Sequence, residues 1–259
     1  KENQVIDIEK YYPEQEARKK FDSPLIVVDP VDKNRNVAAA LSLNQFARFV
    51  AASRAFLKKP SMNFFFPKKT KPLSISEVKK HLQKEGLIVI EIAYPKKTLA
   101  DVMWGQIKRL SNKIKAALEK EEFKILRNDC WTDEKKTIAI IFDLQSNLLE
   151  KATIRMGPKV SDQQNSLKFL MSHKNALSGP RIEDGRWVVE IERKNFDAKQ
   201  FLQKTISALK KTEKADIKRA LNKKAKILSE KEILSKYKKE KEFQEYFSNY
   251  LKGKEEFLA

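Results

Sequence analysis

Few residues of this chain have the chemistry that catalysis or metal binding requires. The sequence contains two histidines and one cysteine, His81, His173 and Cys130. These three side chains cannot supply the four ligands of a structural zinc site, and they form no credible Cys-His or Ser-His-Asp triad. With six glycines and no Gly-x-Gly-x-x-Gly string, the chain also lacks a Rossmann or P-loop nucleotide site. A self-contained nucleotide-hydrolysing enzyme is therefore disfavoured.

One pair of carboxylates has the spacing of a metal site. Asp7 and Glu9 are separated only by Ile8, so an extended strand would place both on one face. Two carboxylates arranged in this way can hold divalent cations. An exposed strand or turn explains the pair equally well, and we assign no catalytic residue and no metal ligand to this chain.

The charge balance indicates a polyanionic partner. Lys and Arg number 54 against 35 Asp and Glu, which gives a net charge of +19 and an isoelectric point near 9.7. Nucleic acid is the partner we expect, because each neutralised phosphate releases counterions, and an anionic membrane surface is the alternative. No apolar run approaches the roughly 20 residues that span a bilayer, and the lone Cys130 forms no internal disulfide. We expect a soluble, cytoplasmic protein without a membrane partner.

Hydrophobic spacing predicts an α+β fold in four parts. Residues 1 to 58 contain a short strand and a helix, and residues 59 to 86 form a Pro- and Lys-rich linker with a short helix. Residues 87 to 193 form an α/β body, and residues 194 to 259 form a basic helical tail. By count, the last part holds 18 Lys and Arg and 10 Asp and Glu, a net of 18 minus 10, or +8.

The first part combines a strand, a sharp turn and a helix. Leu25–Val28 has the composition of a buried strand that ends at the Asp29-Pro30 turn. The helix begins near Asn44 and reaches about Leu57, and Ser42 is a suitable N-cap for it.

The body has the order strand, helix, strand, strand and a further helix. Alternation predicts a strand at Leu87–Tyr94, and apolar spacing predicts a helix at Leu99–Leu118. Two more strands follow at Phe123–Trp131 and Thr137–Leu144, and a helix at Gln163–His173. This order is typical of ferredoxin-like folds, which RRM-like RNA-binding modules share.

Four segments carry a resemblance to a known family. They are Asp29-Pro30-Val31-Asp32-Lys33-Asn34-Arg35-Asn36-Val37-Ala38-Ala39-Ala40-Leu41-Ser42, Pro60-Ser61-Met62-Asn63-Phe64-Phe65-Phe66-Pro67-Lys68, Arg155-Met156-Gly157-Pro158 and Gly185-Arg186-Trp187. In this order and at this spacing they resemble the archaeal-type (class I) CCA-adding enzymes, the tRNA nucleotidyltransferases. The resemblance covers most of the chain.

The resemblance implies that the catalytic part lies elsewhere. In this family a Gly-Ser motif and an Asp-x-Asp-type strand of an amino-terminal head domain hold Mg²⁺ and CTP or ATP, and neither motif occurs here. The chain is expected to be the carboxy-terminal body and tail portion, either a shortened form or one subunit of a split enzyme, and to be inactive alone. Residues 1 to 58 would then be the end of the central (neck) domain, and apolar surface on residues 1 to 60 would bind a separate head subunit.

The resemblance assigns nucleotide binding to Arg35. It implies that this arginine helps to read the base of the incoming nucleotide, for which a planar guanidinium offers paired donors. The alternative is an arginine that pairs with Asp29 or Asp32 and braces the turn. We interpret the two aspartates themselves as structural, because Asp-Pro starts turns.

The remaining assignments concern tRNA. The resemblance places a basic turn of Arg155, Met156, Gly157 and Pro158 near the acceptor end, where Arg155 would take phosphate and Met156 would pack on the terminal bases. A plain turn with a solvated arginine is the alternative. Arg186 is expected to touch RNA, and the neighbouring tryptophan to lie in the core.

Basic and aromatic side chains outside these motifs have two interpretations each. The lysine-rich helical surface comprises Lys210, Lys211, Lys214, Lys218, Arg219, Lys223 and Lys224. It is either a solvated face or an RNA-backbone contact, and we assign Lys210, Lys211, Lys218 and Arg219 to RNA. Phe64, Phe65 and Phe66 either stack on unpaired bases or fasten the linker to a core.

The predicted function is therefore to hold the acceptor stem and T arm of tRNA for template-independent addition of CTP and ATP by a head. The assembly, dimer or higher, is left open. A non-catalytic RNA-binding protein derived from the family is the main alternative, and a lysine-rich DNA-binding or membrane-surface module is the second.

Overall fold

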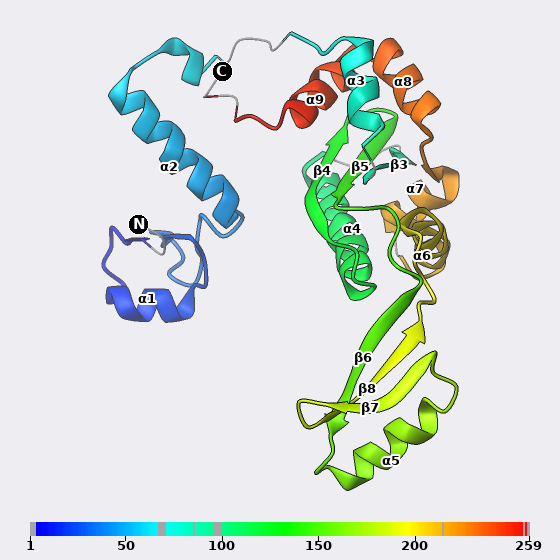
Figure 1. Cartoon of the computed structure of the whole chain (residues 1–259). Helices are drawn as coiled ribbons and strands as arrows, with labels where there is room; N and C mark the ends of the chain where they lie inside the picture. The colour runs from blue at the N-terminus through cyan, green and yellow to red at the C-terminus, as the bar shows by residue number, and fades with distance from the viewer. Residues whose placement is uncertain are drawn as a thin grey trace. The chain divides into compact units, whose positions relative to one another are not determined.

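The computed structural model describes residues 4–66, 71–84, 86–95, 100–213, 215–255 and 257. It consists of two compact units, Lys1–Lys69 with Gly253–Ala259, and Thr70–Lys252 (Figure 1). We call them unit 1 and unit 2. Among the described residues, no helix combines the length and the apolar character that crossing a bilayer requires.

Unit 1 is built on two short parallel strands. β1 (Gln4–Ile6) pairs with β2 (Leu25–Val27), and α1 (Glu14–Lys20) lies between them in the chain. Ala17 of α1 packs with Ile26 and Val28 in a small core. The buried strand expected at this position is confirmed.

The helix α2 (Leu43–Lys58) follows, and its start is fixed by a capping box. The Ser42 hydroxyl accepts from the Gln45 backbone N–H, and the Gln45 side chain accepts from the Ser42 backbone N–H at 3.1 Å. The predicted N-cap is confirmed.

The linker phenylalanines lie after α2 in unit 1. At the end of the short 3₁₀ helix η1 (Met62–Phe64), the rings of Phe64 and of the following Phe65 meet the Phe56 ring edge to face. Both rings therefore contact α2, although Phe64 is half-buried while Phe65 and Phe66 remain exposed. Pro67 and Lys68 lie outside the described residues.

Unit 2 contains a four-stranded antiparallel sheet. Its order is β4 (Ile125–Thr132), β5 (Thr137–Leu144), β3 (Leu87–Ala93) and β9 (Ala225–Ile227). The first three are confirmed at the predicted positions. β9 was missed, because it lies in a stretch whose periodicity predicts only helices and has only three residues.

Helices cover both faces of this sheet (Figure 1). One face packs against α4 (Ala100–Lys120), α6 (Ala198–Thr212) and α7 (Ala215–Lys223). The other packs against α3 (Ile75–Leu82), α8 (Glu230–Lys239) and α9 (Lys241–Lys252). The helices after residue 194 therefore complete the core of the body instead of forming a separate tail. Each has one apolar stripe, which only the sheet and its neighbouring helices can bury.

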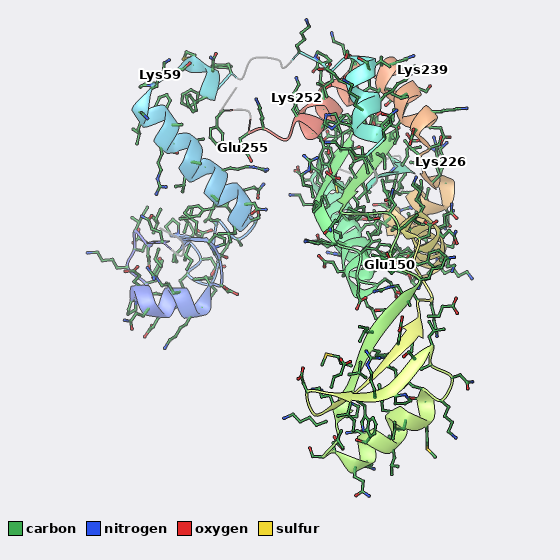
Figure 2. All side chains as sticks on the ribbon, viewed as in Figure 1. Lys59, Glu150, Lys226, Lys239, Lys252 and Glu255 are labelled. Carbon is green, nitrogen blue, oxygen red and sulfur yellow. The ribbon has the colours of Figure 1, made fainter. Side chains whose placement is uncertain are left out.

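A second antiparallel sheet is inserted between β5 and α6. Its order is β6 (Ala152–Lys159), β8 (Arg186–Glu192) and β7 (Ser178–Glu183), with α5 (Gln163–Ser172) between β6 and β7 in the chain. We call β6, α5, β7 and β8 the insert sheet. Glu150 marks the point where the chain enters it (Figure 2). With helices and antiparallel sheets in one chain, the predicted α+β class is confirmed.

Candidate nucleic-acid interface

The turn after β2 is held by its own aspartates. Asp29 Oδ1 accepts from the Val31 backbone N–H at 2.9 Å, and Asp32 Oδ1 accepts from the Asn34 N–H at 2.9 Å. The structural role predicted for both aspartates is confirmed, since short polar side chains satisfy the turn amides locally.

Arg35 has a fixed backbone and an exposed side chain. Its N–H donates to the Asp32 carbonyl at 2.9 Å and its carbonyl accepts from the Asp29 N–H at 3.0 Å. Its guanidinium lies 3.5 Å from Asp29 Oδ2, yet the side chain is 68% exposed. The bracing interaction is therefore present, but it is long and leaves most donors of the guanidinium free for a ligand.

Lys20 brings another cation to this turn, which the sequence interpretation missed. Its ammonium donates to Asn34 Oδ1 at 2.6 Å and also contacts the Tyr12 hydroxyl. The Tyr11 hydroxyl donates to the Pro30 carbonyl at 2.8 Å. The turn is therefore hydrogen-bonded both to α1, through Lys20, and to the residues before α1, through Tyr11. No local signal links Lys20 to Asn34, because the contact depends on how α1 packs.

The carboxylate pair Asp7 and Glu9 does not form a strand-face site. β1 ends at Ile6, and Asp7 Oδ2 accepts from the Tyr12 N–H at 2.9 Å in the following turn. In the described part of the chain, no group of three or more His, Cys, Asp or Glu residues could hold a metal ion. The alternate spacing of Asp7 and Glu9 therefore does not place them together on a face of β1.

The four residues predicted as a basic turn lie in β6, so that prediction was wrong. Met156 is opposite Val188 of β8, and Arg155 is opposite Val189. The register shifts between Met156 and Lys159, where Pro158 has no N–H to donate to β8. Gly157 and Pro158 thus form a bulge instead of a turn, because β6 remains extended through its pairing with β8.

Arg155 and Met156 lie at the surface of β6. Met156 is 62% exposed, and the neighbouring Ile154 is exposed as well. Among the described residues, the Arg155 guanidinium has no hydrogen-bond or ion-pair partner. By register, Met156, Val188 and Arg181 of β7 form one row across the sheet. Val188 in the middle of this row is buried, and Arg181 is half-buried and pairs with Glu183 at 2.6 Å. The exposed apolar and cationic side chains here are therefore Met156 and Arg155, which strand alternation directs to opposite faces of β6.

Gly157 and Arg186 serve the packing of the insert sheet. A Cβ on Gly157 would lie 2.8 Å from the Phe169 ring of α5, so a larger residue there requires this ring to shift. The Gly157 carbonyl accepts from Arg186 Nη1 at 3.0 Å. Arg186 and Trp187 are both half-buried, and the Arg186 contact ties β8 to the bulge.

Lysines of α6 and α7 divide into free and engaged groups. Lys211 is exposed and lines a shallow groove on α6 together with Lys204, which lies two turns earlier on the same face. The sequence interpretation missed Lys204, although its spacing from Lys211 was a usable signal. Arg219 pairs with Asp216 at 2.5 Å, and Lys218 Nζ lies 3.5 Å from the Lys211 carbonyl. Lys210 is half-buried and Lys214 lies outside the described residues.

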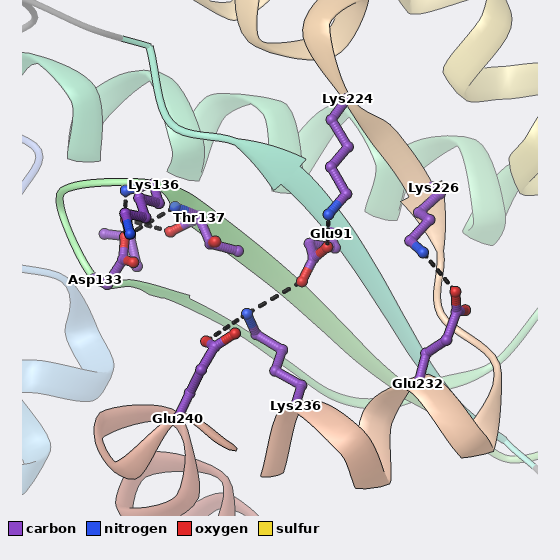
Figure 3. Close-up of polar contacts among 10 residues, drawn as sticks. Glu91, Asp133, Lys136, Thr137, Lys224, Lys226, Glu232, Lys236 and Glu240 are labelled. Atoms are coloured by element: carbon purple, nitrogen blue, oxygen red, sulfur yellow. Dashed lines mark hydrogen bonds and ion pairs between the residues drawn. The ribbon is translucent and has the colours of Figure 1, made fainter. Parts of the chain in front are cut away.

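Two other lysines of this region, the half-exposed Lys224 and the buried Lys236, belong to an ionic network around the buried Glu91 (Figure 3). Glu91 of β3 accepts from Lys224 at 2.6 Å and from Lys236 at 3.1 Å, and Lys236 also reaches Glu240 at 2.6 Å. Burial raises the pKa of Glu91, but the hydrogen bonds from both lysines outweigh it and hold this pKa below its ordinary value. Lys224 and Lys236 therefore stabilise the body and are not free for RNA.

The chain matches two family descriptions. Residues 85–230 match "CCA-adding enzyme, C-terminal domain", and residues 1–66 match "tRNA nucleotidyltransferase, second domain". The CCA-adding enzyme of Saccharolobus shibatae is 35% identical over 186 residues, which cover 72% of this chain and 42% of that protein. Those of Methanosarcina acetivorans and Sulfurisphaera tokodaii are each 32% identical over 73% of this chain, and 42% and 43% of their own lengths are covered.

The chain belongs to the CCA-adding enzyme family, and the resemblance found in its motifs is confirmed. It spans less than half the length of the relatives that it matches.

Proposed function

We propose that this chain is the tRNA-holding part of a CCA-adding enzyme whose catalytic head is a separate polypeptide or a separate region. The observation that carries the proposal is the match over residues 85–230 together with a described surface that offers cations but no metal-binding carboxylates. The chemistry of the complete assembly is attack of the tRNA 3′-hydroxyl on the α-phosphate of CTP or ATP, with release of pyrophosphate. The share of this chain is binding and orientation.

In this proposal the tRNA lies against the insert sheet and the α6 face. The free guanidinium of Arg155 takes a backbone phosphate, and Met156 packs on a terminal base. Lys204 and Lys211 add phosphate contacts on α6, to which Lys218 and Lys210 contribute charge. Arg186 supports the strand that carries Arg155 and Met156, because one of its guanidinium N–H groups already donates to the Gly157 carbonyl.

Arg35 binds the incoming nucleotide in this proposal. Its exposed guanidinium on a fixed backbone is suited to discriminate base edges, because rigid positioning makes the donor pattern selective. Mg²⁺ and the triphosphate are assigned mainly to the head, since the described residues do not fit a metal ion.

We also infer that the body is ferredoxin-like. In chain order, its four strands β3, β4, β5 and β9 occupy the third, first, second and fourth places of the sheet, and every neighbouring pair is antiparallel. A helix follows β3 and two helices precede β9, as in a split β-α-β arrangement. The insert sheet then stands between β5 and α6.

The test is CMP and AMP addition to a tRNA lacking its 3′ CCA, with Mg²⁺. Three samples are compared: this chain, a separately produced family head, and both together. Activity only in the mixture is expected. A head that works equally well without this chain would refute the proposal.

A second candidate function is non-catalytic RNA binding. It is favoured by the same lack of a metal site among the described residues. If the mixture remains inactive while this chain binds tRNA more tightly than duplex DNA or anionic vesicles at equal salt, this second function replaces the first.

A further inference from the structure

The residue after Arg35 is the most enclosed polar residue of the turn. Asn36 is 7% exposed, whereas Asn34 and Arg35 beside it are exposed. A buried amide must find partners for both its oxygen and its nitrogen, or its desolvation is uncompensated.

The Asn36 side chain finds three partners, all on the backbone. Oδ1 accepts from the Val27 N–H at 2.9 Å and from the Ala38 N–H at 3.0 Å, and Nδ2 donates to the Leu25 carbonyl at 3.2 Å. Two of these partners belong to β2. The amide therefore fastens the end of the turn to the strand at its beginning.

Backbone contacts continue this attachment on both sides. Asn36 forms an antiparallel bridge with Val28, and the Val37 N–H donates to the Val27 carbonyl at 2.8 Å. Together with the bond between the Asp29 N–H and the Arg35 carbonyl, they hold the backbone of Arg35 between residues that are bonded to β2 or to the turn. The exposed guanidinium thus projects from a support that is anchored on β2.

We propose that Asn36 is the positioning residue for Arg35, an inference that rests on the proposed function. Only a side chain with both an acceptor and a donor satisfies these three partners. An aspartate of the same shape would keep the two N–H contacts but oppose the Leu25 carbonyl. The turn would loosen, and Arg35 would no longer face the nucleotide in one geometry.

Asp29 completes the arrangement from the other side. Its Oδ1 is occupied by the Val31 N–H, so Oδ2 is left to face the guanidinium at 3.5 Å. Asn36 therefore fixes the backbone of Arg35, and Asp29 limits the directions that its side chain takes. This division makes the two positions testable separately.

The test measures kcat and KM for CTP and ATP in the assembly of this full chain with the head and a tRNA lacking CCA. Asn36→Asp is expected to lower kcat/KM for the nucleotide about tenfold and to reduce the discrimination between CTP and ATP. Arg35→Ala should cause at least the same loss. The double variant should lose no more than Arg35→Ala alone, because Asn36 acts only through Arg35.

Asn34→Asp is the matched control, since it makes the same change of charge and shape two residues away. The Asn34 side chain is exposed, and within the part of the chain that the structure describes its side-chain oxygen accepts from Lys20 alone, a contact that a carboxylate can also make. We expect wild-type discrimination from this control. If Asn36→Asp does not fold, Asn36→Ser replaces it, because a short hydroxyl still offers an acceptor and a donor but cannot satisfy all three partners. Asp29→Asn tests the side-chain contact separately, since its amide oxygen still accepts from the Val31 N–H.

The outcomes separate the two levels of the argument. If Arg35→Ala loses discrimination while Asn36→Asp and Asp29→Asn keep it, or if the double variant is additive, the positioning role is overturned and the proposed function stands. An inactive wild-type mixture overturns the proposed function, and this inference with it.

Discussion

Replacing Glu91 by glutamine removes the central charge of the buried network and keeps the shape of the side chain. Lys236, whose side chain is 5% exposed, then loses one of its two carboxylates. Glu240 remains as a partner, but it is 41% exposed and satisfies the ammonium from the solvent side. Glu91→Gln therefore leaves a buried cation that is only partly compensated.

The magnitude follows from these contacts. Removing one member of a buried pair costs about 3–5 kcal/mol when the remaining charge has no other partner. Lys236 keeps Glu240 and lies over the Trp131 and Phe243 rings, at 5.5 and 5.2 Å, so the cost is lower. We expect a loss of about 2–4 kcal/mol in the free energy of unfolding, or roughly 4–16 °C in melting temperature for a unit of this size.

The assay is thermal and urea unfolding of the full chain at pH 7. Glu119→Gln is the matched control, because it removes a carboxylate from the exposed pair with Lys115. That control should change the free energy of unfolding by less than about 1 kcal/mol, because exposed ion pairs contribute little.

The pH dependence provides an independent check. The pKa of Glu91 is lowered in the folded protein, so its contribution is present above the ordinary carboxyl pKa, 4.5, and is lost as the pH falls through the folded value. The difference between wild type and Glu91→Gln should therefore shrink below about pH 4.5. A variant as stable as the control at pH 7, or a difference that is unchanged from pH 7 to pH 3, would refute the reasoning.

Three further predictions concern single positions. Gly157→Ala should destabilise the chain by about 1–3 kcal/mol in thermal unfolding, because its Cβ would lie 2.8 Å from the Phe169 ring, and adding Phe169→Leu should restore part of the loss; no loss would contradict the packing. Arg155→Ala should weaken tRNA binding and lower the slope of log affinity against log salt by about 1, with an unchanged melting temperature; an unchanged slope would remove Arg155 from the interface. Burial raises the pKa of Cys130 to about 11, so iodoacetamide at pH 8 should alkylate the native thiol about 100-fold more slowly than the urea-unfolded one, and equal rates would count against its burial.

Local signals were sufficient for several elements, including β3, whose partners β5 and β9 lie far away in the chain. Alternating apolar residues were sufficient for β3, β4 and β5, and Ser42 was sufficient for the start of α2. The helix expected at 163–173 is α5, and its start is fixed by the Asp162 side chain, which accepts from the Asn165 backbone N–H.

Non-local pairing decided where the prediction failed. Gly157 and Pro158 are strong turn signals, yet pairing with β8 keeps them in a strand with a bulge. β9 has too few residues to show a period, and it becomes a strand only because β3 presents an open edge to it. The same lysine-rich stretch supplies both exposed lysines and the buried Lys236. Counting charges in the sequence cannot tell these two groups of lysines apart.

The sequence by itself determined the family, the Asp29-Pro30 turn and the excess of positive charge, because each of these depends only on residue types and on short spacings along the chain. Only the tertiary structure decided which cations are free: Glu91 engages Lys224 and Lys236, while Lys211 and Arg155 remain exposed. These contacts join residues far apart in the chain, and their partners are fixed by how the helices pack on the sheet.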